Sequence, residues 1–229
     1  MSETASDPTA VRTARGRPRT PSGERRARIV AAARAIFVDA GYGAMTTNAV
    51  AARCQVSKRT IYEQFANKAE LFGAIVDAHR PEMLRLPRPD DEAPLEDALA
   101  EIFRLDIDED SDRIRNAFIR AALKDGDAFP EVQDLIVAKG VEPSQRALAA
   151  WLDERRREGR LVFDDAEQTA HVLMDLVFTS AASRSVPHDP WPDLASRAAH
   201  QRFCIAVFLN GVRARDRGET ARESARSKA

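Results

Sequence analysis

Hydrophobic residues recur every three or four positions along most of this chain, which is the period of an amphipathic α-helix. The first such segment covers about residues 23–40, where Ser22 is placed to cap the start and Gly41 to end the helix. Runs of β-branched residues are rare, whereas the helix formers Ala, Leu, Arg and Glu are frequent. The sequence therefore predicts an all-α protein.

The segment from Thr46 to Phe65 predicts two short helices joined by a tight turn. Thr46 or Thr47 is placed to cap the first helix, and Ser57 is placed to cap the second. The second helix begins with basic and hydroxyl residues on the side opposite its apolar face. A short helix that is supported from behind and polar at its leading end is typical of a helix-turn-helix that enters the major groove of DNA.

This segment resembles the DNA-binding domain of the TetR family of one-component regulators, over about Glu24 to Ala78. The resemblance rests on Thr46-Thr47, Val50-Ala51, Val56-Ser57-Lys58, Ile61-Tyr62, Phe65, Asn67-Lys68 and Glu70-Leu71-Phe72. One departure is Gln55, where the family most often has glycine in a left-handed conformation. A left-handed Gln55 is expected to carry about 1 kcal/mol of strain.

The resemblance implies an N-terminal three-helix helix-turn-helix DNA-binding domain, followed by a larger C-terminal helical domain for ligand binding and dimerisation. We place the first domain at residues 22–80, including a linking fourth helix whose tilt would transmit ligand occupancy, and the second at residues 81–229. Residues 1–21 lack hydrophobic periodicity and are predicted to form a disordered basic arm.

Charge is segregated along the chain although the formal net charge is only −1. From Arg12 to Arg59 there are eleven Lys and Arg residues against two acidic residues, whereas Glu82 to Asp112 holds twelve acidic residues and three arginines. Such a basic end on an acidic body is expected of a protein that touches phosphates with one end only.

The arm contains Arg15-Gly16-Arg17-Pro18-Arg19, which resembles the core of an AT-hook. Arg17 and Arg19 are therefore candidates for the minor groove or for phosphates, because narrow minor grooves attract arginine. A solvated or non-specific basic tail is the alternative.

The other candidate DNA contacts lie in or beside the helix-turn-helix. Arg59, Thr60 and Asn48 suit base edges, namely guanine, the thymine methyl group and adenine. Thr47, Tyr62 and Lys68 are expected to hold phosphates, which position the protein without specifying sequence. Lys58 is the remaining candidate at the start of the recognition helix.

Helical periodicity continues beyond this motif. A helix from about residue 68 is expected to end at Pro81, and the proline-rich and acidic stretch 81–94 is the expected joint between the domains. Further helices are predicted at about 95–106, 111–124, 130–157 with a kink near Gly140 or Pro143, 164–181 and 193–213.

The last two predicted helices are more apolar around their circumference than a monomer needs, which predicts a homodimer. The candidate interface residues are Val177, Phe203, Ala206, Val207 and Asn210. By resemblance, the same domain holds a pocket for an unnamed small-molecule effector. The candidate pocket residues are Phe103, Phe118, Trp151, Met174 and Phe178, with His171 or Asp175 as polar anchors. Ordinary core packing is the alternative for each of these aromatic residues.

The sequence argues against other classes of function. It contains no Walker loop, HExxH, GxSxG or GxGxxG motif, so an enzyme is not predicted, and no metal or cofactor site is expected. No stretch approaches the ~18 apolar residues of a membrane span, and no secretory signal is visible, so a cytoplasmic protein is expected. Cys54 and Cys204 are expected to be buried thiols, with redox sensing at Cys54 as the alternative. The favoured function is a sequence-specific, DNA-binding repressor released by an effector, and the alternative is a ligand-independent or architectural DNA binder.

Overall fold

The computed structural model describes residues 22–86, 92–182 and 193–213. The predicted arm, including Arg17 and Arg19, and the C-terminal tail lie outside the described residues. Within the described part, the helices are α1 (Ser22–Ala44), α2 (Thr47–Cys54), α3 (Lys58–Tyr62), α4 (Lys68–Met83), α5 (Leu95–Ile102), α6 (Glu109–Gly126), α7 (Pro130–Ile136), the π-helical turn η1 (Val137–Val141), α8 (Glu142–Arg157), α9 (Ala166–Ala182) and α10 (Leu194–Val212). The predicted all-α fold is confirmed. The described residues also contain an isolated β-bridge, which pairs Leu161 with Arg213.

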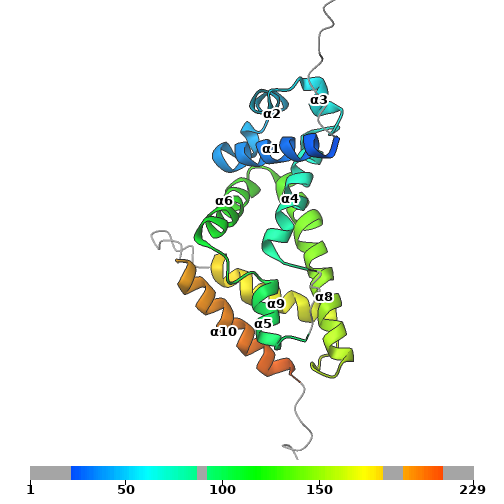
Figure 1. Ribbon diagram of the computed structural model, residues 1–229, viewed down its shortest axis with the longest axis vertical. Helices are drawn as coiled ribbons and strands as arrows, with labels where there is room; N and C mark the ends of the chain where they lie inside the picture. The colour runs from blue at the N-terminus through cyan, green and yellow to red at the C-terminus, as the bar shows by residue number, and fades with distance from the viewer. Residues whose placement is uncertain (1–21, 87–91, 183–192, 214–229) are drawn as a thin grey trace, which may run out of the picture.

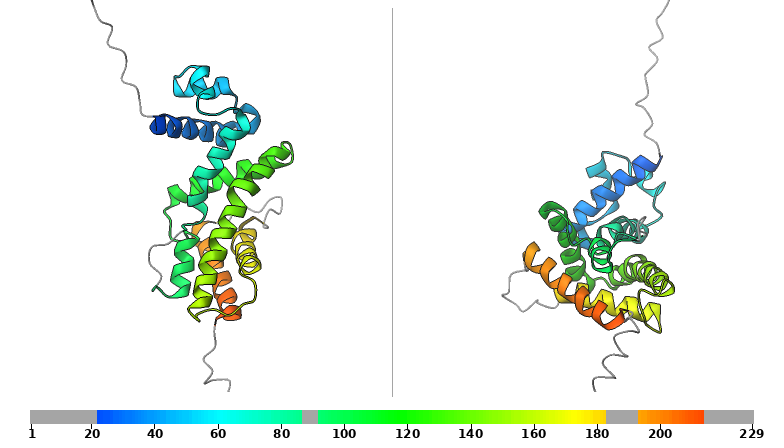
Figure 2. Two further views of the ribbon diagram at one scale, coloured as in Figure 1. Left: turned by 90° about the vertical axis from the view of Figure 1, so that its right-hand side faces the viewer. Right: turned by 60° about the horizontal axis from the view of Figure 1, so that its bottom comes forward.

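The helices form an elongated molecule with two ends of different character (Figure 1). At one end α1, α2 and α3 form a small three-helix unit, which we call the reading head. We call α5 to α10 the body. Helix α4 runs from the reading head down into the body, as the turned view in Figure 2 also shows. None of the helices in the described ranges is both long and apolar enough to cross a membrane.

Helix boundaries agree with the sequence in most places. The sequence pattern predicts an end of the first helix at Gly41, whereas α1 continues to Ala44 past a non-helical Gly41. Two further differences concern α4 and α5. Pro81 lies inside α4 and does not end it. A proline removes one backbone donor, but the neighbouring hydrogen bonds can remain intact. The amide of Leu84 still donates to the carbonyl of Arg80 at 3.1 Å. The helix predicted at 95–106 ends at Ile102, because Arg104 adopts φ 55° and the amide of Leu105 closes onto the carbonyl of Ala100 at 2.9 Å.

The expected irregularity in the long helix after Pro130 is a single π-helical turn at Val137–Val141. A π turn inserts an extra residue between hydrogen-bond partners and changes the direction of the helix faces on either side. This turn contains Gly140, and Pro143 follows in the first turn of α8, where its missing N–H costs little.

Two hydrophobic cores hold the molecule together. The body core joins α5, α8, α9 and α10 through residues such as Leu99, Leu152, Leu173 and Ile205. The other core begins in the reading head and extends through α4 to Phe118 on α6 and Val132 on α7. The reading head therefore packs directly on α6 and α7 of the body, and its core does not stop at residue 80.

Candidate functional site: a DNA-reading helix and an apolar cavity

The turn between α2 and α3 is set by local hydrogen bonds. Thr46 Oγ1 accepts from the Ala49 amide at 3.2 Å, and Ser57 Oγ accepts from the Thr60 amide at 3.1 Å, so both helices have the predicted caps. Gln55 has φ 56° and ψ 42°, which is the left-handed conformation in which the TetR family most often has glycine by the resemblance noted above. These caps fix where α3 begins and therefore which side chains it carries at its leading end.

Helix α3 is supported from behind by buried apolar side chains and by an arginine. Ile61 and Phe65 are each 2% exposed and belong to the core of the reading head. The Arg26 guanidinium lies 4.2 Å above the Phe65 ring, and its Nη1 donates to the carbonyl of Gln64 at 3.3 Å. Arg26 thus fixes the end of the recognition segment in this structure, a role that its place in the basic N-terminal stretch did not reveal.

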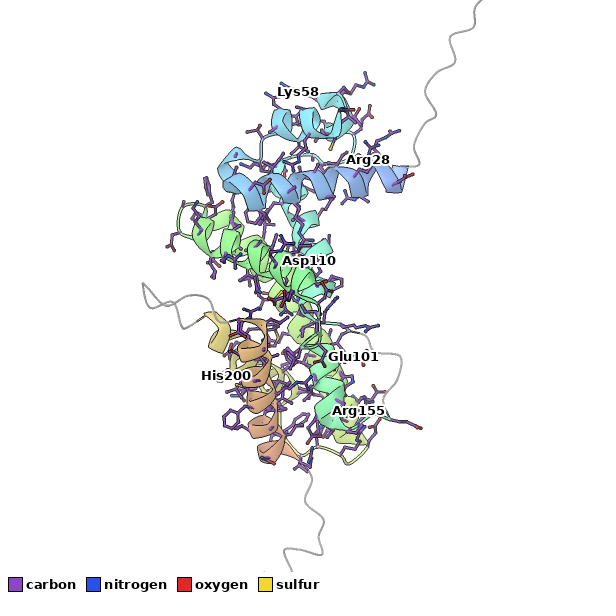
Figure 3. The ribbon with its side chains drawn as sticks, turned by 60° about the vertical axis from the view of Figure 1, so that its left-hand side comes forward. Arg28, Lys58, Glu101, Asp110, Arg155 and His200 are labelled. Carbon is purple, nitrogen blue, oxygen red and sulfur yellow. The ribbon has the colours of Figure 1, made fainter. Side chains whose placement is uncertain are left out.

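The opposite side of α3 faces solvent and carries the predicted DNA contacts. Lys58 lies at the outer end of the molecule, as Figure 3 shows. The Arg59 side chain is 89% exposed, and its Nε lies 3.0 Å from Glu63 Oε1. Tyr62 is 57% exposed, and Thr60 Oγ1 lies 2.9 Å from Ser57 Oγ. These four residues share one short exposed helix, which suits a surface that meets DNA.

The remaining DNA candidates lie around this helix. Asn48 is exposed and Thr47 half-buried in the first turn of α2. Lys68 opens α4, and its Nζ lies 3.9 Å above the Tyr42 ring. Burial lowers the pKa of Lys68, although the nearby carboxylates of Glu131 and Asp125 oppose that shift. Lys68 therefore sits at the junction between reading head and body as well as near the recognition helix.

That junction includes a carboxylate of the body that binds the backbone of the reading head. Asp125, in the last turn of α6, accepts a hydrogen bond from the backbone amide of Tyr42. The preceding Gly41 has φ 84°, and a Cβ atom there would lie 2.7 Å from Asp125 Oδ2. The close approach of α6 thus requires a residue without a side chain at position 41.

A cavity of about 290 Å³ lies between α4, α6, the π-helical turn, α9 and α10. Its walls are mainly apolar and include Val76, Met83, Phe118, Ile119, Ala122, Ile136, Met174 and Phe178. This volume and composition are typical of a site for a small organic molecule.

Polar side chains also reach this cavity, and most come from α4, α6 and α10. They are His79, Arg80, Arg115, Asn116, Gln133, Ser144, Arg197 and Gln201. The buried carboxylate of Asp112 pairs with Arg115 at 3.2 Å and also with Arg197. No acidic residue lines the cavity in the described part of the chain.

His79 connects the cavity to the reading head. Its Nδ1 lies 2.8 Å from Glu82 Oε2, and Glu82 in turn accepts from both terminal nitrogens of Arg34 on α1 at 2.6 Å. Burial lowers the pKa of His79, while Glu82 opposes that shift. Burial alone would raise the pKa of Glu82, but hydrogen bonds from His79 and Arg34 outweigh it and lower that pKa to about 2. The buried His79 Nε2 has no partner among the described residues.

Three of the seven predicted pocket residues line the cavity, namely Phe118, Met174 and Phe178. Phe103 is instead buried in the body core, with its ring 5.4 Å from that of Phe178. Trp151 also belongs to that core and lies 5.1 Å from the Arg155 guanidinium. His171 and Asp175 are exposed, because that side of α9 faces away from the cavity, and His171 Nε2 lies 3.4 Å from Asp175 Oδ2.

The sequence reasoning missed the residues that give the cavity its polarity. His79 continues the apolar stripe of α4 that holds Phe72, Ile75 and Val76, so its position on the buried side was visible from helical spacing. Arg115 and Asn116 gave no such signal, because arginine and asparagine within a helix are usually solvent-facing.

An apolar face on α10 remains exposed in the single chain. Phe203 is 65% exposed and Val207 48% exposed, and Ala206 and Asn210 lie exposed on the same side. Val172 and Leu176 on α9 are also exposed. Val177 differs from the expectation, because it faces the other side of α9 and is fully buried in the body core.

Comparisons with known proteins agree with this architecture. Residues 29–75 match the tetR family of bacterial regulatory proteins, and residues 97–211 match the C-terminal domain of AefR-like transcriptional repressors. The HTH-type transcriptional activator FasR of Mycolicibacterium smegmatis is 41% identical over 61 residues, a match that spans 27% of this chain and 28% of FasR.

Solved structures extend the similarity to most of the chain. A TetR-family transcriptional regulator of Mesorhizobium loti superimposes with a TM-score of 0.64 at 19% identity, over 85% of this chain and 100% of that one. The flavonoid-responsive regulator FrrA gives a TM-score of 0.63 at 26% identity, over the same shares. The helix-turn-helix, the helical body and the two family matches together establish that this chain belongs to the TetR family of bacterial transcriptional regulators.

Proposed function

We propose that this protein is a homodimeric transcriptional repressor that leaves its DNA operator when a small molecule fills the cavity beside α4. The observation that carries the proposal is that α4 contributes both to the core of the reading head and to the wall of the cavity. Its Leu71 and Phe72 belong to the core of the reading head, and its Val76, His79 and Met83 line the cavity. A ligand that favours one position of α4 thereby also favours one position of the reading head, which is the requirement for coupling between two sites.

The proposed DNA contacts are those of the exposed side of the reading head: Lys58, Arg59, Thr60, Tyr62, Asn48 and Thr47, with Lys68 and the arm residues Arg17 and Arg19. Arg59, Thr60 and Asn48 are assigned to bases, and Thr47, Tyr62 and Lys68 to phosphates. Arg17 and Arg19 are assigned to the minor groove or to phosphates, and Lys58 is a further contact at the start of the recognition helix. The exposure of Lys58, Arg59 and Tyr62 supports this assignment.

The proposed dimer interface is the exposed apolar face of α10, formed by Phe203, Ala206, Val207 and Asn210, together with Val172 and Leu176 of α9. A two-fold dimer holds two α3 helices at a fixed separation, so that both bind one operator with high effective concentration. Two-fold symmetry of the protein also predicts an inverted-repeat operator.

A ligand-independent DNA binder is the competing function, and the chemistry of the cavity argues against it. A purely architectural protein gains nothing from a cavity of about 290 Å³ that carries buried arginines and an imidazole nitrogen without a partner among the described residues. The name of FrrA describes a flavonoid-responsive protein, which supports a ligand response in a protein of the same fold.

The test begins with selection of bound sequences from random double-stranded DNA by the full-length protein. The proposal expects an inverted repeat, bound by two chains, and loss of binding when a compound from an organic library occupies the cavity. A ligand that binds in calorimetry but tightens the operator complex would contradict release by the ligand and would show coupling of the opposite sign. Failure to enrich any sequence at moderate salt would exclude sequence-specific binding.

A further inference from the structure

The cavity described above has free hydrogen-bonding groups on uncharged side chains. Asn116 of α6 and Ser144 of α8 line the cavity and are only 5% and 6% exposed. Neither side chain has a hydrogen-bond partner among the described residues, and packing does not close off the polar atoms of either one. Because both side chains are buried and face the cavity, a ligand inside it can reach their polar atoms.

The arginines of the wall already have partners. Arg80 Nη1 lies 3.9 Å from Asp77 Oδ1, and Arg115 Nη2 lies 3.2 Å from Asp112 Oδ1. Arg197 also pairs with Asp112. A charged ligand group would have to lose its hydration and compete with these pairs. The arrangement therefore favours an uncharged ligand group.

Two further polar side chains of the wall are less available to a ligand. His79 Nδ1 lies 2.8 Å from Glu82 Oε2, and packing closes off His79 Nε2, which has no partner in the described part of the chain. Gln201 Nε2 donates to the carbonyl of Val177 at 3.2 Å. Among the buried side-chain amides of the wall, that of Asn116 thus keeps both its donor and its acceptor free.

A free amide is best satisfied by a ligand group that both donates and accepts hydrogen bonds. The amide nitrogen carries two N–H donors and the oxygen accepts, so both roles remain whichever way the amide of Asn116 is turned. A carboxylate only accepts and an ammonium group only donates, and each would leave one end of the buried amide unsatisfied. A carboxamide or a hydroxyl group offers both functions.

The rest of the wall suits an apolar body. Phe118, Met174 and Phe178 line the cavity together with Ile119, Ile136 and Val141. Apolar surface buried against these side chains favours binding by about 25 cal/mol per Å². A small, fully hydrophilic molecule would gain nothing from this part of the wall.

We propose that the effector is an uncharged organic molecule with an apolar body and a polar group that donates to and accepts from the side-chain amide of Asn116. The apolar body lies against Phe118, Met174 and Phe178. The word effector rests on the proposed function, whereas the binding itself is independent of DNA. The proposal assigns amides and hydroxyl compounds as the ligand class and excludes organic ions and plain hydrocarbons as the preferred ligands.

Two series of probes with matched head groups test this class by calorimetry on the full-length protein without DNA. The aliphatic series is octanamide, octanoate and methyl octanoate, and the aromatic series is naphthamide, naphthoate and methyl naphthoate. The carboxylate has nearly the size of the carboxamide but only accepts, and the ester is uncharged but also only accepts. In at least one series we expect the carboxamide to bind about tenfold more tightly than both partners. Equal or weaker binding of the carboxamide in both series, or no binding by any probe, would overturn the proposal.

Matched variants locate the polar group of the ligand. Asn116→Leu replaces the amide by an apolar side chain of similar size. Gln168→Leu is its control, because it also removes a side-chain amide, but Gln168 is exposed on α9 and does not line the cavity. The preference for the carboxamide should disappear in Asn116→Leu and persist in Gln168→Leu. A preference that persists in Asn116→Leu would contradict the assignment.

A measurement on the unaltered protein guards against loss of folding in Asn116→Leu. The side-chain amide resonance of Asn116, assigned through the backbone of α6, should shift in nuclear magnetic resonance spectra when the preferred carboxamide is added. An unchanged resonance at saturation would overturn the proposal.

Release of the selected operator by the same carboxamide is measured separately. A carboxamide that binds at Asn116 without releasing DNA contradicts the proposed function and leaves the ligand class standing. Release of DNA by a compound that does not bind at Asn116 has the opposite meaning, because it supports the proposed function and overturns the ligand class.

Discussion

The carboxylate of Asp125 on α6 accepts a hydrogen bond from the backbone amide of Tyr42 in the reading head. Both residues are buried, and a Cβ atom at the neighbouring Gly41 would lie 2.7 Å from the carboxylate, so that it would force the carboxylate to move. Because Phe118, Ala122 and Arg115 of the same helix line the cavity, α6 touches both the cavity and the reading head. Helix α6 thus provides a second connection beside α4.

Replacing Asp125 by alanine should destabilise the protein. The variant leaves the buried Tyr42 amide without its acceptor, which is expected to cost about 1–3 kcal/mol. Asp127→Ala is the control, because Asp127 is exposed two residues further along. The free energies of unfolding are compared by urea denaturation. Equal values for the two variants would show that the hydrogen bond contributes nothing measurable.

Replacing Gln55 by glycine should preserve or raise stability. Gln55 has φ 56°, and relief of strain of about 1 kcal/mol is offset in part by the greater freedom of glycine in the unfolded chain. Gln55→Ala is the control, because alanine retains the left-handed strain. We compare the free energies of unfolding of both variants with the parent protein. A clear loss in Gln55→Gly alone would contradict this account of the turn.

Replacing Arg59 by alanine should weaken operator binding by about 1–3 kcal/mol and relax the sequence preference at one base position. The Arg59 side chain is exposed and pairs with the exposed Glu63 just after α3, so its loss should leave the fold intact. Binding is measured by fluorescence anisotropy with a set of single-base operator variants. Lys68→Ala should instead weaken all sequences alike and reduce the salt dependence of binding.

Arg156→Ala in the body is the control for both DNA-contact variants. Arg156 pairs with Asp153 on α8, which lies outside the reading head. Its removal changes the net charge by the same amount as the other two variants. If Arg156→Ala weakens DNA binding as much as Arg59→Ala, the effect is one of total charge and the assignment to base contact fails.

Replacing Phe203 by aspartate should convert the proposed dimer into monomers. Phe203 is 65% exposed in the single chain, and a carboxylate there would be buried without a partner in the dimer. Val162→Asp is the control, because Val162 is 64% exposed but lies outside the α9 and α10 face. Sedimentation measures the mass of both variants. A dimeric Phe203→Asp variant would exclude this face as the interface.

Acidification should destabilise the fold in part through His79. Burial lowers its pKa below the ordinary 6.5, so the unfolded chain binds a proton at higher pH than the folded chain does. The stability that the neutral His79 contributes is therefore fully present above pH 6.5, and it is lost as the pH falls towards the pKa of the folded state. His79→Gln should lose less stability between about pH 7 and about pH 5 than the parent protein.

The control for the acidification experiment is His171→Gln, because His171 lies exposed on α9. This variant should follow the pH dependence of the parent protein, measured as the free energy of unfolding at each pH. Glu82 acts in the same direction at lower pH, because its folded pKa of about 2 lies below the ordinary 4.5. Parallel curves for His79→Gln and the parent would show that His79 does not contribute to acid sensitivity.

The sequence alone determined the features that depend on neighbouring residues. Apolar spacing, the caps at Thr46 and Ser57 and the left-handed Gln55 are set within one or two helical turns, and the structure has each of them where the pattern predicts it. The exposed face of α10 also follows from spacing, because Phe203, Ala206, Val207 and Asn210 recur at helical intervals. Which family the chain belongs to was likewise visible in the local motif.

Only the tertiary structure decided which buried side chains face an open cavity and which face packed core. Phe103 and Phe118 occupy equivalent positions in their helical patterns, yet the first fills the body core and the second lines the cavity. The charge of that cavity depends on Asp112, Arg115 and Arg197, which are brought together from α6 and α10 across 85 residues of chain. Periodicity records only that a residue faces inward, because what it meets there is contributed by helices distant in the sequence.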